Sequence, residues 1–137
     1  MPRVPTLIVA DDSALSRSVV QQALIGLPIK VIEADSGNAV IRALNAHKPH
    51  AVILDICMPY PDGLTLLRMI RQDEEFGDLP VIICSVENGM MERAEAEVYG
   101  ISGYLTKPLD LKLLREMVTL TLGLTTPAAD SNVASAS

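Results

Sequence analysis

Three aspartates, a serine and a lysine each come at or just after the end of a short apolar segment, where a strand would end. Asp11 and Asp12 follow residues 6–10, Asp55 follows 51–54, Ser85 follows 81–84, and Lys107 comes soon after 104–105. If these segments are parallel strands of one sheet, their ends share one edge and the five side chains converge there. The set would combine carboxylate ligands, a hydroxyl donor and an ammonium group.

Such a cluster favours chemistry on a phosphoryl group. Three carboxylates in contact repel one another, and at least one would stay protonated unless a cation joined them. A hard divalent cation with oxygen ligands, with Mg²⁺ the expected ion, relieves the repulsion and keeps coordination sites for phosphate oxygens. An ionised aspartate beside Mg²⁺ and a lysine is placed to attack phosphorus, a reaction catalysed mainly by alignment and charge neutralisation. Ser85 and Lys107 would then each bind a phosphoryl oxygen.

The segment AVILDICMPYPDG, residues 51–63, shows how the chain presents one of these carboxylates. Its four leading apolar residues do not alternate with polar ones, which is typical of a strand buried on both faces of a parallel sheet. Asp55 comes where this strand ends, and Pro59, Pro61 and Gly63 then force a loop. Asp35 also follows an expected strand, but an outer one, and is expected only to help the turn.

The whole chain alternates short apolar segments with helical patterns, which predicts an α/β fold. Strands are expected at residues 6–10, 31–32, 51–54, 81–84 and 104–105. With a helix after each strand, this pattern predicts a doubly wound five-stranded parallel sheet of flavodoxin-like order 2-1-3-4-5. In that order the first and third strands are neighbours, with the fourth and fifth alongside, so the polar strand ends fall together.

Apolar residues that recur about one turn apart predict the helix faces. They are Leu15, Val19, Ala23 and Leu27 in the first helix, Met90, Ala94 and Val98 in the fourth, and Leu113, Leu114, Met117 and Leu120, expected to point inward, in the last. On the third helix Arg68 and Arg71 are expected to face water.

Length and composition bound the function classes. The 137 residues are 49% hydrophobic, enough for one domain, expected at residues 1–124, before a disordered Ala/Ser-rich tail at 125–137. The net charge of -6 argues against non-specific binding to nucleic acid or anionic membranes. No signal peptide or membrane-spanning stretch is expected, and Cys57 and Cys84 are expected as free thiols in a reducing cytoplasm.

The quoted residues resemble the motif set of receiver domains of two-component response regulators, of the small chemotaxis-regulator type. The resemblance spans about residues 5–122 and rests on Asp11-Asp12, Asp55, Met58-Pro59, Asp62-Gly63, Ser85, Tyr104 and Lys107-Pro108. It implies a stand-alone response regulator that accepts a phosphoryl group on Asp55 from a histidine kinase or His phosphotransfer protein. The protein would be a signalling phosphoacceptor, catalysing only its own phosphorylation and dephosphorylation, and a cytoplasmic monomer is expected.

The resemblance also implies roles around Asp55. Asp12 would bind Mg²⁺ directly and Asp11 largely through water, while the backbone carbonyl of Cys57 would supply a further ligand. The peptide bond between Lys107 and Pro108 would be cis, which is energetically accessible only before proline.

A switch is implied as well. Once Asp55 is phosphorylated, Ser85 would move toward the phosphoryl group and Tyr104 would turn inward, reshaping the face of the fourth helix, fifth strand and fifth helix. A downstream partner would bind this face, and the exposed residues of the fourth and fifth helices are expected to determine which partner binds. Those residues are Met91, Glu92, Glu95, Lys112 and Glu116.

Three positions near the site depart from the family pattern or add charge. Ser85 stands where threonine is common, Val86 stands where a smaller residue is usual, and Glu87 adds negative charge. A valine at the mouth of the site would hinder entry of water or a phosphodonor, so slow loss of the phosphoryl group is expected.

Two other functions remain open from the residues. An aspartyl phosphatase or phosphotransferase on a related sheet would need a second aspartate two residues after the nucleophile, where this chain has Cys57. A flavin-type binding module would need a glycine-rich loop after the first strand, and none follows residues 6–10. The intact acidic set argues against a receiver that has lost phosphorylation.

Overall fold

The computed structural model describes residues 4–86 and 90–124, so Glu87 and the expected tail at 125–137 lie outside the described residues. The strands are β1 (Thr6–Ala10), β2 (Lys30–Ala34), β3 (Ala51–Asp55), β4 (Val81–Ser85) and β5 (Gly103–Thr106). The helices are α1 (Ala14–Ala23), α2 (Gly37–His47), α3 (Gly63–Gln72), α4 (Met90–Tyr99) and α5 (Leu111–Thr121). All pairings are parallel and the order is β2-β1-β3-β4-β5, which confirms the predicted fold.

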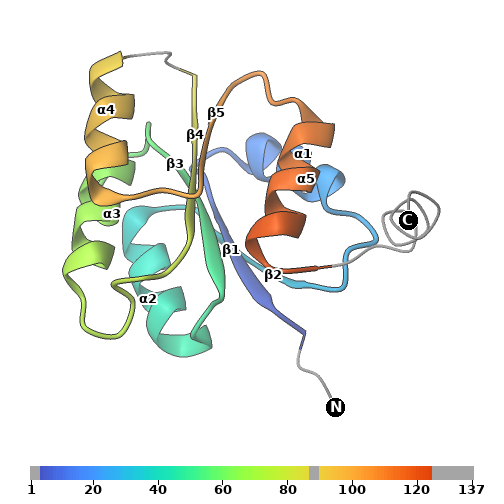
Figure 1. Ribbon diagram of the computed structural model, residues 1–137, viewed down its shortest axis with the longest axis horizontal. Coiled ribbons are helices and arrows are strands. Elements are labelled where there is room, and N and C mark those ends of the chain that lie inside the picture. Colours follow the sequence, from blue (N-terminus) through green and yellow to red (C-terminus); the bar gives the residue numbers. More distant parts are fainter. Residues whose placement is uncertain (1–3, 87–89, 125–137) are drawn as a thin grey trace, which may run out of the picture.

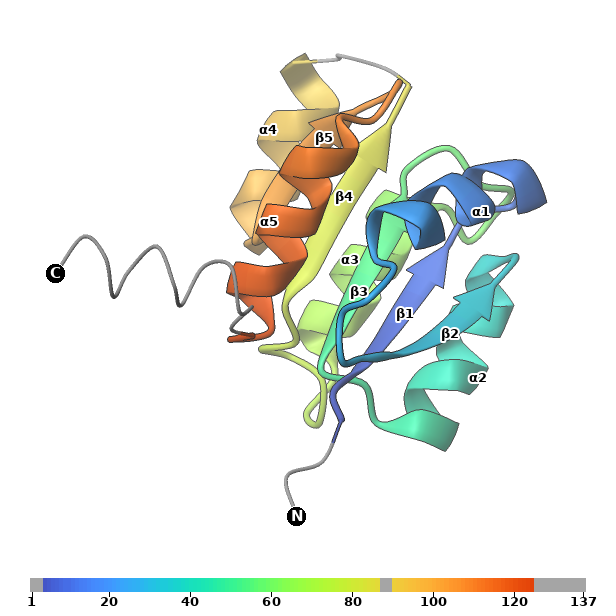
Figure 2. The same cartoon turned by 90° about the vertical axis from the view of Figure 1, so that its right-hand side faces the viewer.

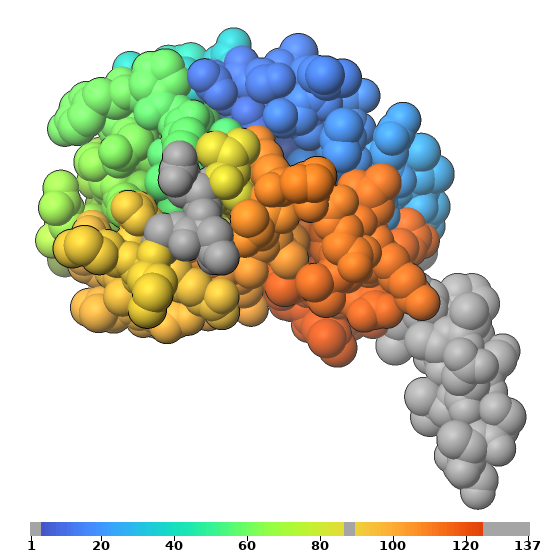
Figure 3. All heavy atoms as spheres, turned by 90° about the horizontal axis from the view of Figure 1, so that it is seen from above, coloured from blue at the N-terminus to red at the C-terminus, as the bar shows by residue number. Residues whose placement is uncertain are grey.

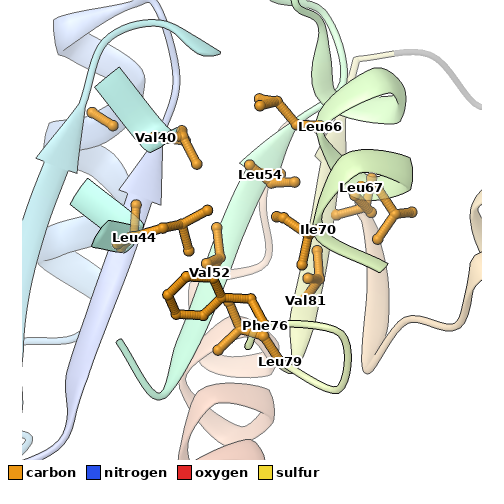
Figure 4. Close-up of a cluster of buried hydrophobic side chains, with 14 of the residues drawn as sticks. Val40, Leu44, Val52, Leu54, Leu66, Leu67, Ile70, Phe76, Leu79 and Val81 are labelled. Carbon is orange, nitrogen blue, oxygen red and sulfur yellow. The ribbon is translucent and has the colours of Figure 1, made fainter. Parts of the chain in front are cut away.

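The helices form two layers, one on each face of the sheet (Figures 1 and 2). Helices α2, α3 and α4 cover one face, and α1 and α5 cover the other. Between α2, α3 and β3 the buried side chains interlock, among them Leu44, Leu54 and Ile70 (Figure 4). Each fully buried aliphatic side chain of this kind contributes about 1.5–3 kcal/mol, so this packing fixes where the strand ends lie. Within residues 4–86 and 90–124, no helix is long and apolar enough to span a lipid bilayer.

The two inner strands β3 and β4 carry the polar residues that the fold must accommodate. Every residue of both strands is buried, as predicted for apolar segments without alternation. Asp55 and Ser85 are the last residues of β3 and β4, and they are the only polar residues in these two strands. Buried polar groups are costly without partners, so the sheet must supply partners where these strands end.

The predicted apolar face of α1 is right in part. Ala23 and Leu27 are buried as predicted, but Leu15 is 76% exposed, and Val20 and Leu24, which were not predicted, are buried. The helix is therefore turned so that the face running back from Val20 through Ser16 points toward the sheet. This rotation brings two residues of α1 into the site described below.

The predicted inward face of α5 is wrong in part. Leu114 and Val118 are fully buried, but Leu113 is 44% exposed and Leu120 is 81% exposed. Leucines occur on two sides of this helix, so periodicity alone could not select the packed side. The apolar residues predicted to form the inner face of α4, Met90, Ala94 and Val98, are exposed as well, and the buried residue of this helix is Ala96.

Arg71 on α3 was predicted to face water, and this prediction is also wrong. Its guanidinium group donates hydrogen bonds to the carbonyl oxygens of Tyr99 at 2.9 Å and of Gly100 at 2.8 Å. A further bond reaches the carbonyl oxygen of Gly77 at 3.2 Å. Arg71 thus caps the end of α4 and ties it to α3.

Candidate functional site

The carboxyl ends of the inner strands bring the predicted polar residues to one edge of the sheet. Ala10 pairs with Leu54 across β1 and β3, so Asp11 and Asp55 follow at matching positions on neighbouring strands. Seen from above, segments from the blue, green, yellow and orange parts of the chain meet at this end of the molecule (Figure 3). The strand register alone therefore places residues far apart in the sequence in one cluster.

Lys107 joins the two buried carboxylates of this cluster. Its ammonium nitrogen lies 2.7 Å from Asp11 Oδ2 and 3.3 Å from Asp55 Oδ2. It also donates to Ser16 Oγ at 3.4 Å. One positive charge is thus shared between two carboxylates and steadied by a hydroxyl group, as expected when a single lysine serves an acidic site.

Asp11 and Asp55 are oriented in the same way. Both are buried, with 4% and 5% of their surface exposed. Asp11 Oδ1 accepts a hydrogen bond from the backbone N–H of Ser13 at 2.9 Å, and Asp55 Oδ1 accepts one from the N–H of Cys57 at 3.0 Å. Each carboxylate therefore uses one oxygen to hold the loop that follows its strand and turns the other toward Lys107.

Asp12 completes a set of oxygen ligands that suits Mg²⁺. Asp11, Asp12 and Asp55 each offer one carboxylate oxygen, and these atoms all lie within 4.8 Å of one another. Asp12 is exposed while the other two are buried, so the cluster opens toward solvent on one side. Few carboxylates and an open side for water and phosphate oxygens are what Mg²⁺ prefers, so the residues fit this ion.

The protonation of the site follows from its burial. Burial raises the pKa of the Asp55 carboxyl group, and the negative charge of Asp11 adds to this, while the Cys57 N–H and Lys107 act in the opposite direction. Burial alone would lower the pKa of Lys107, but its bond to Asp11 and the nearby negative charges outweigh burial and raise that pKa. The site without a cation therefore holds excess negative charge.

The remaining predicted residues are buried to different degrees. Ser85 is fully buried, and its carbonyl oxygen accepts the backbone N–H of Lys107 at 2.7 Å. Val86 is 60% exposed beside it. Tyr104 is half-buried, with the guanidinium carbon of Arg93 5.3 Å from its ring centre.

The backbone around the site has two cis peptide bonds. One joins Lys107 to Pro108, and the other, which was not predicted, joins Tyr60 to Pro61. The second lies in the loop between Asp55 and α3. This loop ends at Gly63, the first residue of α3, where a side chain would collide with the backbone of Asp55 and Ile56, so only glycine allows the start of α3 to approach β3 so closely.

Two residues of the site, Ser16 and Arg17, were not predicted. Arg17 donates to the carbonyl oxygen of Asp11 at 2.6 Å, and Ser16 contacts Lys107 as described above. The sequence could have indicated both residues, because they precede the buried Val20 by about one helical turn and so lie on its side of α1. The predicted apolar face included Leu15 instead of Val20, and it therefore missed them.

A sequence model described as the response regulator receiver domain matches residues 7–119. The chain belongs to this family. Receiver domains are signalling modules that histidine kinases or phosphotransfer proteins phosphorylate, and they bind Mg²⁺ at an acidic pocket.

Individual relatives agree with this assignment. The chain is 32% identical over 119 residues to the chemotaxis protein CheY1 of Helicobacter pylori, an alignment that covers 85% of this chain and 96% of that protein. It is 38% identical over 111 residues to the DNA-binding transcriptional regulator NtrC of Klebsiella pneumoniae, covering 81% of this chain but 23% of that protein. Among solved structures, a response regulator receiver protein from Pseudomonas putida has a TM-score of 0.81 at 28% identity, covering 88% and 99% of the two chains.

Proposed function

We propose that this receiver domain accepts a phosphoryl group on Asp55 from a phosphohistidine of a histidine kinase or His phosphotransfer protein, and that Mg²⁺ is required. The observation that carries the proposal is the buried Asp55 carboxylate, bound by Lys107 next to the Asp11–Asp12 pair. Asp11 is also buried and bound by Lys107. What favours Asp55 over Asp11 is the sequence that follows it, Met58-Pro59 and Asp62-Gly63, which matches the segment after the phosphoacceptor in receiver domains.

In the proposed reaction, a carboxylate oxygen of Asp55 forms a bond to phosphorus as the bond from phosphorus to the histidine nitrogen breaks. The product is an acyl phosphate on Asp55 and a free histidine on the donor. Asp12, Asp55 and the carbonyl oxygen of Cys57 would ligate Mg²⁺ directly, and Asp11 largely through water. When bound, the ion neutralises negative charge on the transferring phosphoryl oxygens. Lys107 pairs with one of these oxygens, and Ser85 donates its hydroxyl proton to another.

The direct test is labelling of the full chain by a small acyl phosphate or phosphoramidate, read as mass added to the intact protein. Labelling is expected with Mg²⁺ and is expected to fall to background with excess chelator, because the carboxylates then repel the donor. Equal labelling with and without the metal would contradict the proposed mechanism.

The consequence of phosphorylation is proposed to be a change in partner binding at α4, β5 and α5. Ser85 would move toward the phosphoryl group, and Tyr104, already half-buried at the edge of one core cluster, would turn further inward. The outer side of α4 supports this location, since Met90, Met91 and Val98 are each more than 80% exposed. Large apolar side chains that gather on one exposed helix are typical of interaction surfaces. A cytoplasmic, monomeric protein with its receiver domain at residues 1–124 completes the proposal.

The side chain of Val86 is proposed to lengthen the life of the phosphoryl group, together with Glu87. Val86 follows the buried Ser85 directly and is 60% exposed. Its methyl groups would hinder the approach of water to a phosphoryl group on Asp55. The Val86→Ala variant is expected to lose its phosphoryl group several-fold faster, measured as decay of the labelled protein after the donor is removed. A lifetime that is unchanged or longer in the variant would show that Val86 does not limit access.

A further inference from the structure

Arg17, in the first turns of α1, holds the backbone of the segment that carries the acidic pair. One guanidinium nitrogen donates to the carbonyl oxygen of Asp11 at 2.6 Å. This carbonyl belongs to the peptide group that joins Asp11 to Asp12. The orientation of that peptide group therefore depends on Arg17, and so does the direction in which the exposed Asp12 carboxylate leaves the chain.

The same arginine is fixed to a second element of the fold. Its Nε donates to Glu33 Oε1 on β2 at 2.8 Å, and only 14% of its side chain is exposed. The backbone N–H of Asp11 donates to the carbonyl oxygen of Ala34, also on β2, at 3.1 Å. The Asp11 backbone is thus fastened to β2 on both sides, directly through its N–H and through Arg17 at its carbonyl.

We infer that Arg17 is a positioning residue that sets the Mg²⁺ affinity of the site by fixing the Asp11–Asp12 peptide group. The inference rests on the proposed function, because it assumes that Asp12 and its neighbours hold the ion. It assigns Arg17 no contact with the phosphoryl group or the metal. Groups that orient metal ligands in this way typically change metal affinity by 10–100-fold when they are removed.

The charge of Arg17 and its positioning role predict opposite changes in Mg²⁺ affinity when the residue is replaced, so the direction of the change tests the inference. Arg17 carries a positive charge near a cation site, so removing that charge would strengthen Mg²⁺ binding if only electrostatics mattered. If positioning dominates, its removal weakens binding. Lysine keeps the charge but lacks the planar fork that reaches both Asp11 and Glu33. The Arg17→Lys variant therefore separates the two effects.

The experiment titrates MgCl₂ into the full chain by calorimetry, without phosphodonor, for the wild type and for Arg17→Lys and Arg17→Gln. Both variants are expected to bind Mg²⁺ about tenfold more weakly. Their labelling by a small acyl phosphate is expected to be slow at low Mg²⁺ and to recover at saturating Mg²⁺. Arg42→Gln, which removes the same charge from an exposed position on α2, is expected to leave the affinity unchanged.

Each outcome decides the matter. Unchanged Mg²⁺ affinity in Arg17→Lys, or tighter binding in Arg17→Gln, overturns the inference. Circular dichroism confirms folding at the assay temperature; if Arg17→Gln is not folded, the affinity of Arg17→Lys decides alone. A slow labelling rate that saturating Mg²⁺ does not restore also overturns it, because that result indicates general damage to the site. If the wild type itself neither binds Mg²⁺ nor accepts the label, the proposed function fails instead.

Discussion

Replacing Asp55 with asparagine is expected to abolish phosphorylation, reducing the labelling rate by more than about 100-fold. The amide of asparagine has almost the same shape as the carboxylate but is a very poor nucleophile toward phosphorus. The variant keeps an oxygen for the N–H of Cys57, so the loop after β3 should stay in place. Intact mass after incubation with a small acyl phosphate and Mg²⁺ measures the effect.

The matched control is Asp35→Asn. Asp35 also follows a strand, but the edge strand β2, and it is exposed outside the described carboxylate cluster. We expect this variant to be labelled at the wild-type rate. If Asp55→Asn still accepts the label at that rate, the assignment of Asp55 is wrong.

Loss of labelling in Asp55→Asn should not reflect unfolding. The pKa of Asp55 is raised in the folded protein, mainly by burial, so ionising this group costs stability as the pH rises through its folded-state pKa. At neutral pH and without metal, the uncharged asparagine avoids this cost. Chemical denaturation should therefore show the variant to be at least as stable as the wild type, as is common where a functional site is strained.

Replacing Lys107 with methionine is expected to destabilise the metal-free protein by about 3 kcal/mol at neutral pH. The change leaves two buried carboxylates facing each other without the cation that now lies 2.7 Å from one and 3.3 Å from the other. Methionine keeps most of the apolar stem, so the loss reports on the charge. Urea denaturation in the presence of a chelator measures it.

The pH and metal dependence identify the cause of this destabilisation. The pKa of Lys107 is raised in the folded state. The contribution of its positive charge to the free energy of unfolding is therefore present throughout neutral pH and is lost only above about pH 10.5 in the wild type. In Lys107→Met the deficit should shrink as the pH falls and a carboxyl group takes up a proton, and it should shrink when Mg²⁺ is added. Lys112→Met removes the same charge from an exposed position on α5. An equal loss of stability in both variants would contradict this account.

The placement of Asp11, Asp55, Ser85 and Lys107 could be predicted from the sequence because it depends on strands alone. Parallel strands have one direction, and each ends where its apolar segment ends, so the polar residues that follow must share an edge. A shift of one residue in an assigned boundary does not move them elsewhere. The strands β2 and β5 were predicted in the right places but too short, and this error in length did not affect the predicted positions of the polar residues.

The helix faces could not be predicted as well, because α1, α4 and α5 carry apolar residues on more than one side. On α1 the choice between the faces of Leu15 and Val20 depends on which side the sheet can pack. That information lies in other elements, not in the helix. The error concealed Ser16 and Arg17, whose partners come from a strand and a loop distant in the sequence.

The bonds from Arg71 to the last turn of α4 bear on how a signal would travel through this molecule. They hold the end of α4 that lies away from the acidic cluster, so we expect that end to act as the pivot if phosphorylation displaces the helix. Displacement at the Ser85 end would then swing α4 rather than slide it along its axis. The longest travel would fall to Met90 and Met91, whose thioether side chains adjust readily to a new contact surface.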